Sequence, residues 1–374
     1  MHNAASTDLR DITFWNDLIS LGNRRPLISD HIANKRVLIT GAGGSIGSAL
    51  TQAVHASHPA TLVLLDTSEN ALYQIDRSLH EVGSHQHIPI LGSVTNRIQI
   101  SHLFDQHQPQ IIFHAAALKH VPLMEQNPFA AIENNALGTF TLAEAALTHH
   151  AAHLILVSTD KAVDPLSIMG ASKRIAELIL LALGTVATRM TAVRLCNVIG
   201  SQGSVLPLFL EQLAQNLPLT VTHRDAHRYF ITLDRAIDTL FTALQSQSTS
   251  AILIPDPGFP ARILELAQHL RHSRASSVPI TFTGLRPGDK LTEHLLSSRE
   301  HLVSTPLPHT PVLRAIESPA PTLSTLHTAL DALREATQIH DLTHLLRAVQ
   351  TLVPEYQPSE TLATQLELAP ELQA

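Results

Sequence analysis

Three adjacent side chains, Thr159, Asp160 and Lys161, offer a hydroxyl, a carboxyl group and an amine at one place in the chain. They directly follow the apolar run 154–157, which has the composition of a buried strand. Ligands of open α/β sheets bind outside the carboxyl ends of the strands, so reactive groups at a strand end can meet a substrate. Because a neighbouring carboxyl group and amine can act as acid and base, we interpret 159–161 as a catalytic segment.

A glycine-rich segment follows an earlier apolar run and contains Gly41, Gly44 and Gly47 in a G-x-x-G-x-x-G pattern. The first glycine permits a tight turn, the second lets the backbone approach a pyrophosphate, and the third lets a helix pack closely on the sheet. Ser45 and Ile46 open that helix, whose free N–H groups are expected to face the phosphates. The segment predicts a dinucleotide site.

Asp66 ends the next apolar run, 19 residues beyond Gly47. An acid at this place accepts hydrogen bonds from the adenosine ribose hydroxyls and repels a 2′-phosphate. The following residues, 67–70, include no arginine or lysine that would hold such a phosphate. We therefore expect NAD as the cofactor, with NADP disfavoured.

The elements that must position these groups alternate regularly between apolar runs and helical spacing. Expected strands at 37–40, 62–65, 111–113 and 154–157 alternate with expected helices at 45–53, 70–82, 131–147 and 171–183. This alternation predicts an α/β fold with a doubly wound parallel sheet, Rossmann-like, and a smaller C-terminal substrate-binding region. We expect an N-terminal lead-in at 1–34, a dinucleotide-binding domain at 35–196 to which 231–256 returns, a substrate-binding region at 197–310, and a C-terminal helical segment at 311–374.

The glycine pattern, together with His114-Ala-Ala-Ala117 and Asn135 in the segment 135–139, resembles the extended short-chain dehydrogenase/reductase family. Members of that family normally carry a Tyr-x-x-x-Lys pair. Here the lysine is Lys173, and Met169 stands where the tyrosine is expected. Methionine neither donates nor accepts a proton usefully, so the acid and base must lie elsewhere.

Residues 159–161, with Met169 and Lys173, resemble those of the bacterial polysaccharide-biosynthesis UDP-N-acetylglucosamine 4,6-dehydratases, including those whose tyrosine is replaced by methionine. Further motifs of that subgroup occur in the same order at 8–26, 118–125, 194–200, 201–205, 222–225, 228–230, 284–290 and 352–356. Two positions depart from the pattern: Cys196 replaces a usual glycine, and Ser93 replaces a usual aspartate near the adenine.

The resemblance implies dehydration of a UDP-sugar, UDP-N-acetylglucosamine, to a UDP-4-keto-6-deoxy-N-acetylhexosamine for bacterial glycan biosynthesis. It implies that Asp160 is the general acid and Lys161 the base, that Thr159 hydrogen-bonds the sugar's 4-oxygen, and that Lys173 holds the nicotinamide ribose. These roles require a raised pKa at Asp160 and a lowered pKa at Lys161. Burial would shift both pKa values as required, because it raises the pKa of an acid and lowers that of a lysine.

The remaining expected site residues form two groups. The cofactor group consists of Gly41, Gly44, Ser45, Ile46, Gly47, Asp66, Ser93, Val94, Ala115, Ala116, Ala117, Asn135 and Lys173. The substrate group consists of Lys119, His120, Asn197, Ser204, Val205, Arg228 and Arg286. We interpret Arg228 and Arg286 of the substrate group as diphosphate clamps, because guanidinium presents a planar fork of donors. The alternative is that each arginine forms a structural salt bridge.

Composition limits the other possibilities. The net charge of -7 argues against nucleic-acid binding, and the single cysteine fits a reducing compartment. No apolar run is long enough for a membrane span and no secretory signal is recognisable, so we expect a cytoplasmic protein, or the soluble part or relative of a membrane-anchored enzyme. We also expect a homo-oligomer, dimeric or larger. The run containing His80, His85 and His87 is interpreted as surface histidines, with no metal site.

Two other functions remain open from the sequence. One is a nucleotide-sugar epimerase, including a dehydratase that inverts carbon 5, because the residues do not show which face is reprotonated. The other is a non-catalytic dinucleotide-binding regulator, which the missing tyrosine favours and the 159–161 segment disfavours.

Overall fold

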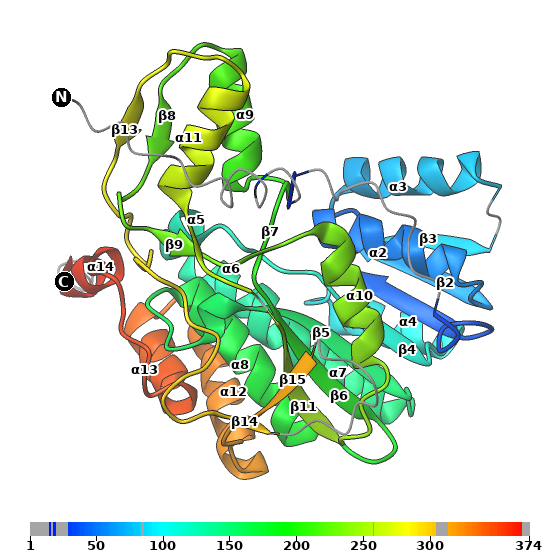
Figure 1. The fold of residues 1–374 in the computed structure, drawn as a ribbon. Helices are drawn as coiled ribbons and strands as arrows, with labels where there is room; N and C mark the ends of the chain where they lie inside the picture. Colours follow the sequence, from blue (N-terminus) through cyan, green and yellow to red (C-terminus); the bar gives the residue numbers. More distant parts are fainter. Residues whose placement is uncertain are drawn as a thin grey trace, which may run out of the picture.

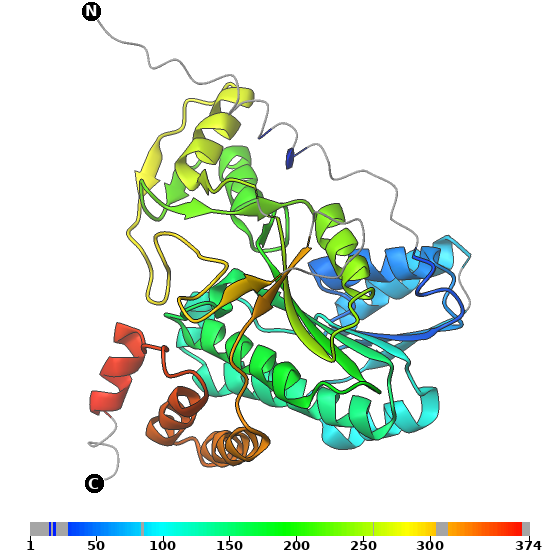
Figure 2. The ribbon, with the colours of Figure 1, turned by 60° about the horizontal axis from the view of Figure 1, so that its bottom comes forward.

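The computed structural model describes residues 15, 18–19, 29–83, 86–256, 258–303 and 313–368. A large layered body surrounds a central sheet, and a smaller cap lies at one side of it (Figures 1 and 2). Within the described residues no helix is long and apolar enough to cross a membrane.

Nine strands form the central sheet, in the order β14-β15-β11-β6-β5-β4-β1-β2-β3. Their bounds are β1 Arg36–Thr40, β2 Thr61–Asp66, β3 His87–Leu91, β4 Ile111–His114, β5 His153–Thr159, β6 Arg189–Leu195, β11 Ser250–Pro255, β14 His301–Val303 and β15 Leu313–Glu317. The strands from β3 to β11 are parallel, whereas β15 and β14 add on in antiparallel pairing. Most central strands are buried along nearly their whole length, which explains their continuous apolar runs.

Helices cover both faces of the sheet (Figure 1). One face packs against α2 (Ser45–Ala56), α3 (Glu69–Glu81) and α10 (Leu233–Ala243). The other packs against α4 (Arg97–His107), α7 (Gly138–Thr148), α8 (Ile168–Leu183), α12 (Leu323–Ile339) and α13 (Leu342–Leu352). Shorter helical pieces are α5 (Val121–Glu125), α6 (Pro128–Ala131), a π-helix (Ile132–Leu137), a 3₁₀ turn (Asp160–Ala162) and α14 (Glu360–Leu368).

The cap has a hydrophobic core of its own. It contains α9 (Val205–Ala214), β8 (Leu219–Val221), α11 (Ile263–Ser273) and β13 (Ile280–Phe282), with small pairings of β7 (Asn197–Val198) to β10 (Phe230–Ile231) and β9 (His227–Arg228) to β12 (Ala261–Arg262). Phe209 and Leu266 are fully buried in this core. Trp15, from the expected lead-in, packs edge-on against Phe230 with ring centroids 5.5 Å apart. The cap therefore joins three distant parts of the sequence.

The predicted doubly wound α/β fold is confirmed, with two differences in detail. The antiparallel strands β14 and β15 extend the sheet, although their residues lie in ranges expected to form the substrate-binding region and a helical segment. The expected helix 131–147 is interrupted by the π-helix at Ile132–Leu137. Most of the expected lead-in lies outside the described residues.

Candidate active site at the carboxyl ends of the strands

The glycine-rich loop lies between β1 and α2, and its shape depends on missing side chains. Gly41 has a φ of 68°, and a Cβ there would lie 2.6 Å from the backbone nitrogen of Ala116. A Cβ at Gly47 would collide with the carbonyl oxygen of Gly41. At Gly44, by contrast, the added atom would approach only that same oxygen, at 3.3 Å, so this backbone is open to a ligand. Such a loop, followed by a helix N-terminus, fits a dinucleotide pyrophosphate.

Asp66 stands beside this loop at the end of β2. One carboxylate oxygen accepts a hydrogen bond from the backbone of Gly43 and the other from Ser68, each at 2.8 Å. The carboxylate thus fixes the loop, and each oxygen keeps a further lone pair for a ribose hydroxyl. The hydroxyl of Ser45 accepts a hydrogen bond from the backbone of Gln202 at 2.9 Å, which ties the loop to the segment leading into the cap.

The other expected cofactor residues line the loops after neighbouring strands. Ser93 and Val94 follow β3; Val94 is buried against Gly138, and the Ser93 hydroxyl hydrogen-bonds that of Thr95 at 2.8 Å. The segment 115–117 follows β4, beside Gly41. The structure therefore gathers the expected cofactor residues at one edge of the sheet.

Asn135 has a different position from the one expected. It lies in the π-helix, is 1% exposed, and its amide donates to the Leu118 carbonyl at 2.9 Å and the Ser172 hydroxyl at 3.0 Å. Its amide oxygen accepts from the Leu118 backbone at 2.8 Å. Through these contacts Asn135 holds the loop after β4 against α8, and its role in cofactor binding stays a prediction.

The catalytic segment is held by hydrogen bonds among its own members. Asp160 is fully buried, and its Oδ1 accepts from the Thr159 hydroxyl at 2.9 Å and from Lys161 Nζ at 3.0 Å. Its other oxygen, Oδ2, is buried without a hydrogen-bond partner in the part of the chain that the structure describes. Lys161 Nζ also donates to the Asn197 side chain at 3.3 Å. A hydroxyl, an acid and an amine thus meet at the end of β5.

Cys196, the residue at a usual glycine position, is buried close to this segment. Burial raises the pKa of its thiol, and the nearby charge of Asp160 raises it further. The thiol therefore stays protonated and contributes an uncharged, apolar wall beside the acid.

The base role requires a lowered pKa at Lys161, and in this structure the attraction of adjacent carboxylates opposes that shift. Burial acts to lower that pKa, but the adjacent carboxylates of Asp160 and Glu293 outweigh it, and the pKa is raised. The ammonium lies 3.0 Å from Asp160 and 4.0 Å from Glu293, so the charged form is stabilised. The resting state of the site is an Asp–Lys ion pair.

Glu293 is a site residue that the sequence analysis missed. Its side chain is 3% exposed and lies 4.0 Å from Arg228 Nε and 3.5 Å from Lys290 Nζ, besides its contact with Lys161. Its position three residues after Lys290, next to a motif already identified, was the available signal. The carboxylate neutralises three cations that converge from β5, β9 and the 284–290 segment.

Lys173 lies on α8, one helical turn after Met169, and both side chains are buried. Burial lowers the pKa of Lys173 to about 8, while Glu177 opposes the change. Its Nζ has no hydrogen-bond partner within the described residues. A buried ammonium in this state is a ready donor for a ribose hydroxyl. Met169 belongs to the hydrophobic core and offers no proton.

A buried ion network fixes β5 and α8 relative to each other. Ser158 donates to Glu177 at 2.7 Å, and Glu177 pairs with Arg194 on β6 at 2.7 Å. Arg194 also pairs with Glu300 at 2.7 Å, and Arg174 contacts both acids. Burial alone would raise the pKa of Glu177, but the two arginines lower it. The network holds the residue that precedes Thr159.

Two expected substrate residues, Lys119 and His120, follow β4 and face the start of the cap. Lys119 Nζ donates to the Gln202 carbonyl at 2.7 Å, and burial, assisted by the charge of Lys161, lowers its pKa. Burial also lowers the pKa of His120, helped by the charges of Lys119 and Arg286. These couplings place the cations near one another.

The two expected arginine clamps are already engaged. Arg228 donates to the carbonyls of Leu291 and Lys290, at 3.1 and 2.8 Å. Arg286 pairs with Asp289 at 2.8 Å and has a largely exposed side chain. Arg228 therefore holds the 290–293 segment, whereas Arg286 could exchange its exposed partner for a diphosphate.

Ser204 and Val205 lie at the N-terminus of α9, where the buried Ser204 hydroxyl has no hydrogen-bond partner among the described residues.

The fold and the loop define an extended short-chain dehydrogenase/reductase. Residues 37–315 match the family model described as "Polysaccharide biosynthesis protein", and the chain belongs to that family. It is 40% identical over 281 residues to "Capsular polysaccharide biosynthesis protein CapD" of Staphylococcus aureus, covering 73% of this chain and 47% of CapD. It is 41% identical over 303 residues to "Probable polysaccharide biosynthesis protein EpsC" of Bacillus subtilis, covering 79% and 50%. The chain thus spans about half the length of these relatives.

Other similar proteins carry more specific names. A "UDP-glucose 4-epimerase" of Rickettsia rickettsii is 32% identical over 277 residues, covering 71% of this chain and 79% of that protein. The solved structure of Pen from Bacillus thuringiensis superposes with a TM-score of 0.69 at 26% identity, covering 78% and 89%. A dTDP-glucose 4,6-dehydratase, DesIV of Streptomyces venezuelae, solved with NAD and DAU bound, has a TM-score of 0.62 at 22% identity, covering 70% and 88%. At that identity the likeness concerns the fold alone.

Proposed function

We propose that this chain catalyses the NAD-dependent 4,6-dehydration of UDP-N-acetylglucosamine. The observation that carries the proposal is the hydrogen-bonded set of Thr159, Asp160 and Lys161 at the end of β5, in a site whose tyrosine position holds Met169. Elimination of water needs both an acid and a base near the sugar, and this segment supplies both. A binding module would need neither.

The site's own groups fit NAD. The open backbone at Gly44 suits the pyrophosphate, Asp66 suits the adenosine ribose, and the unpartnered ammonium of Lys173 suits the nicotinamide ribose. When bound, NAD⁺ supplies a temporary acceptor for the hydride of sugar carbon 4 and returns that hydride to carbon 6.

The residues then have to move two protons. Lys161 removes the proton from carbon 5, and Asp160 protonates the hydroxyl that leaves carbon 6, while Thr159 hydrogen-bonds the oxygen on carbon 4. The resting ion pair is one proton transfer away from this state, because moving a proton along the 3.0 Å bond from Nζ to Oδ1 yields a neutral amine and a carboxylic acid together. Burial favours that uncharged pair, and substrate that displaces solvent around the exposed quarter of Lys161 would favour it further.

Epimerisation is the second candidate, and the 32% identity to proteins named UDP-glucose 4-epimerase favours it. An epimerase removes and returns hydride at one carbon and does not need to protonate a leaving hydroxyl. The buried Oδ2 of Asp160, which has no hydrogen-bond partner among the described residues, is better suited to the dehydratase, because it can serve a substrate hydroxyl.

The test is incubation of the protein with NAD⁺ and UDP-N-acetylglucosamine, followed by mass spectrometry of the nucleotide sugar. A product lighter by one water supports the dehydratase. A product of unchanged mass but altered stereochemistry would identify an epimerase, and unchanged substrate would leave only a binding role.

Two variants examine the division of labour in deuterium oxide. Lys161→Met and Asp160→Asn should each lower turnover by roughly 100- to 10,000-fold, the usual cost of deleting a general base or acid. Asp160→Asn should still exchange the carbon-5 hydrogen for deuterium after oxidation, because its base is intact, whereas Lys161→Met should not. Exchange in the Lys161 variant alone would mean that the roles are reversed.

A further inference from the structure

One side-chain cluster lies outside the active site and has no part in the proposed reaction. Asp76 and His80 lie one turn apart on α3, and His87 is the first residue of β3. One ligand atom from each of the three lies within 4.8 Å of the others. The expectation that the histidines of this run are surface residues is wrong for His87, whose side chain is only 2% exposed, while His80 is 54% exposed. His85 lies outside the described residues.

The separations within the cluster are close to those around a bound metal ion. Asp76 Oδ1 lies 2.9 Å from His87 Nε2 and 3.6 Å from His80 Nε2. Ligands at 2.0–2.1 Å from a tetrahedral zinc ion are about 3.3 Å apart, so the two measured distances bracket the required one. The imidazole rings of His80 and His87 meet edge-on with centroids 4.8 Å apart.

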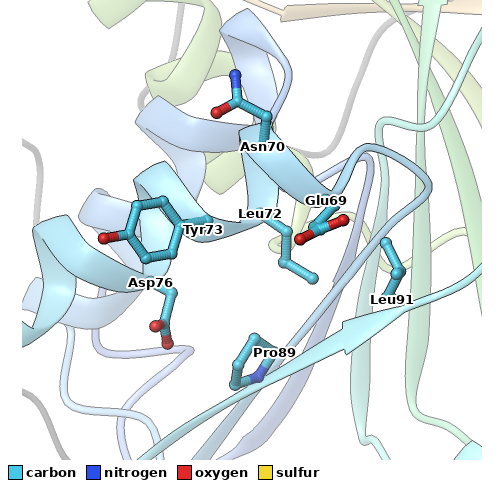
Figure 3. A pocket seen from close by; sticks show the side chains of 7 residues that line it. All are labelled: Glu69, Asn70, Leu72, Tyr73, Asp76, Pro89 and Leu91. Carbon is cyan, nitrogen blue, oxygen red and sulfur yellow. The ribbon is translucent and has the colours of Figure 1, made fainter.

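We propose that Asp76, His80 and His87 bind one divalent transition-metal ion, with zinc as the expected occupant. Two imidazole nitrogens and a carboxylate oxygen are ligands that suit zinc, and water can fill the fourth position. Asp76 also lines a hollow of about 640 Å³ between α3 and β3, together with Tyr73 and Pro89 (Figure 3), and the half-exposed His80 opens the cluster to solvent.

The place of the cluster in the fold points to a structural role. His87 is at the amino end of β3, whereas the catalytic segment follows the carboxyl end of β5. Strands β4, β1 and β2 separate β3 from β5, a distance of about 19 Å at the usual strand spacing. A metal ion here would join the last turns of α3 to the edge strand of the sheet. It would therefore stabilise the unit that also carries Asp66, without touching the substrate.

The test uses the full chain without a histidine tag. Competition with a chromophoric zinc chelator should reveal one tight equivalent of zinc, and His80→Ala should weaken its binding by about 10-fold or more. His102→Ala, which removes an exposed histidine from α4, is the matched control and should change nothing. With zinc at about 100 times its dissociation constant, the melting temperature should rise by about 3 °C in the parent chain but not in His80→Ala.

A second measurement tests the contribution of the buried ligand His87. Cobalt(II) in place of zinc should give visible absorption that His87→Gln and Asp76→Asn remove, and circular dichroism shows whether these variants fold. Absence of a tight equivalent in the parent chain would overturn the proposal. So would equal zinc binding by the parent and His80→Ala, since the ion would then be held by other histidines.

Discussion

Replacing Glu293 with glutamine should make the proposed base easier to deprotonate. Glu293 lies 4.0 Å from Lys161 Nζ and is one of the two carboxylates that raise the pKa of that lysine. Two unit charges 4 Å apart interact by about 1 kcal/mol in water and about 4 kcal/mol at an effective dielectric constant of 20. With 1.36 kcal/mol per pKa unit, the Lys161 pKa should fall by about 1 to 3 in Glu293→Gln.

The sign follows from the role of the base. A neutral Lys161 is needed, so activity is lost as pH falls through the Lys161 pKa, and a lower pKa moves this acidic limb to lower pH. Arg228 and Lys290, no longer neutralised, would act in the same direction. We therefore expect the acidic limb of the kcat/KM profile for dehydration to move down by about 1 to 3 pH units.

The assay is the pH dependence of water loss from UDP-N-acetylglucosamine, with the parent chain, Glu293→Gln and two controls. Glu293→Asp keeps the charge, so its limb should stay close to that of the parent. Glu265→Gln removes an exposed carboxylate of the cap, paired with Arg262, and should leave the profile unchanged. A limb that stays in place or moves to higher pH in Glu293→Gln would refute the reasoning, even if the rate itself falls.

Three further outcomes are expected. Calorimetric titration should show NAD binding at least about tenfold more tightly than NADP, a difference of about 1.4 kcal/mol, because Asp66 repels a 2′-phosphate. The opposite preference would show that Asp66 does not select the cofactor in this way. Met169→Leu nearly conserves volume and should keep appreciable dehydratase activity, so a loss of about 1000-fold in a folded protein would reveal an unrecognised function. Arg194→Met leaves Arg174 as the one remaining arginine partner of the buried Glu177 and Glu300 within the described residues. It should lower the free energy of unfolding by about 3 to 5 kcal/mol in urea titration, whereas a loss below about 1 kcal/mol would show that the network is not needed for stability.

Much of the site could be predicted because it follows local rules. The glycines, Asp66 and the 159–161 segment each stand next to an apolar run, and in a parallel sheet the carboxyl ends of all strands meet at one edge. Lys173 follows Met169 at helical spacing, so their shared face is also readable from the sequence.

Other features depend on contacts between residues distant in the sequence. The pKa of Lys161 is raised mainly by its neighbour Asp160, but Glu293, 132 positions away, raises it further, and no local pattern predicts that contact. The hydrogen bonds of Asn135 and Arg228 likewise join separate segments, and they show a loop-supporting role that the sequence did not predict.

The sequence by itself determined the alternation of strands and helices and the dinucleotide loop, because periodicity and spacing act over a few residues. The candidate acid and base came from the resemblance of residues 159–161 to a known subgroup. Only the tertiary structure decided the antiparallel extension by β14 and β15, the contact of Lys161 with Glu293 and the meeting of Asp76 with His87. Burial, charge and metal geometry depend on atoms a few ångströms apart in space, whatever their separation along the chain.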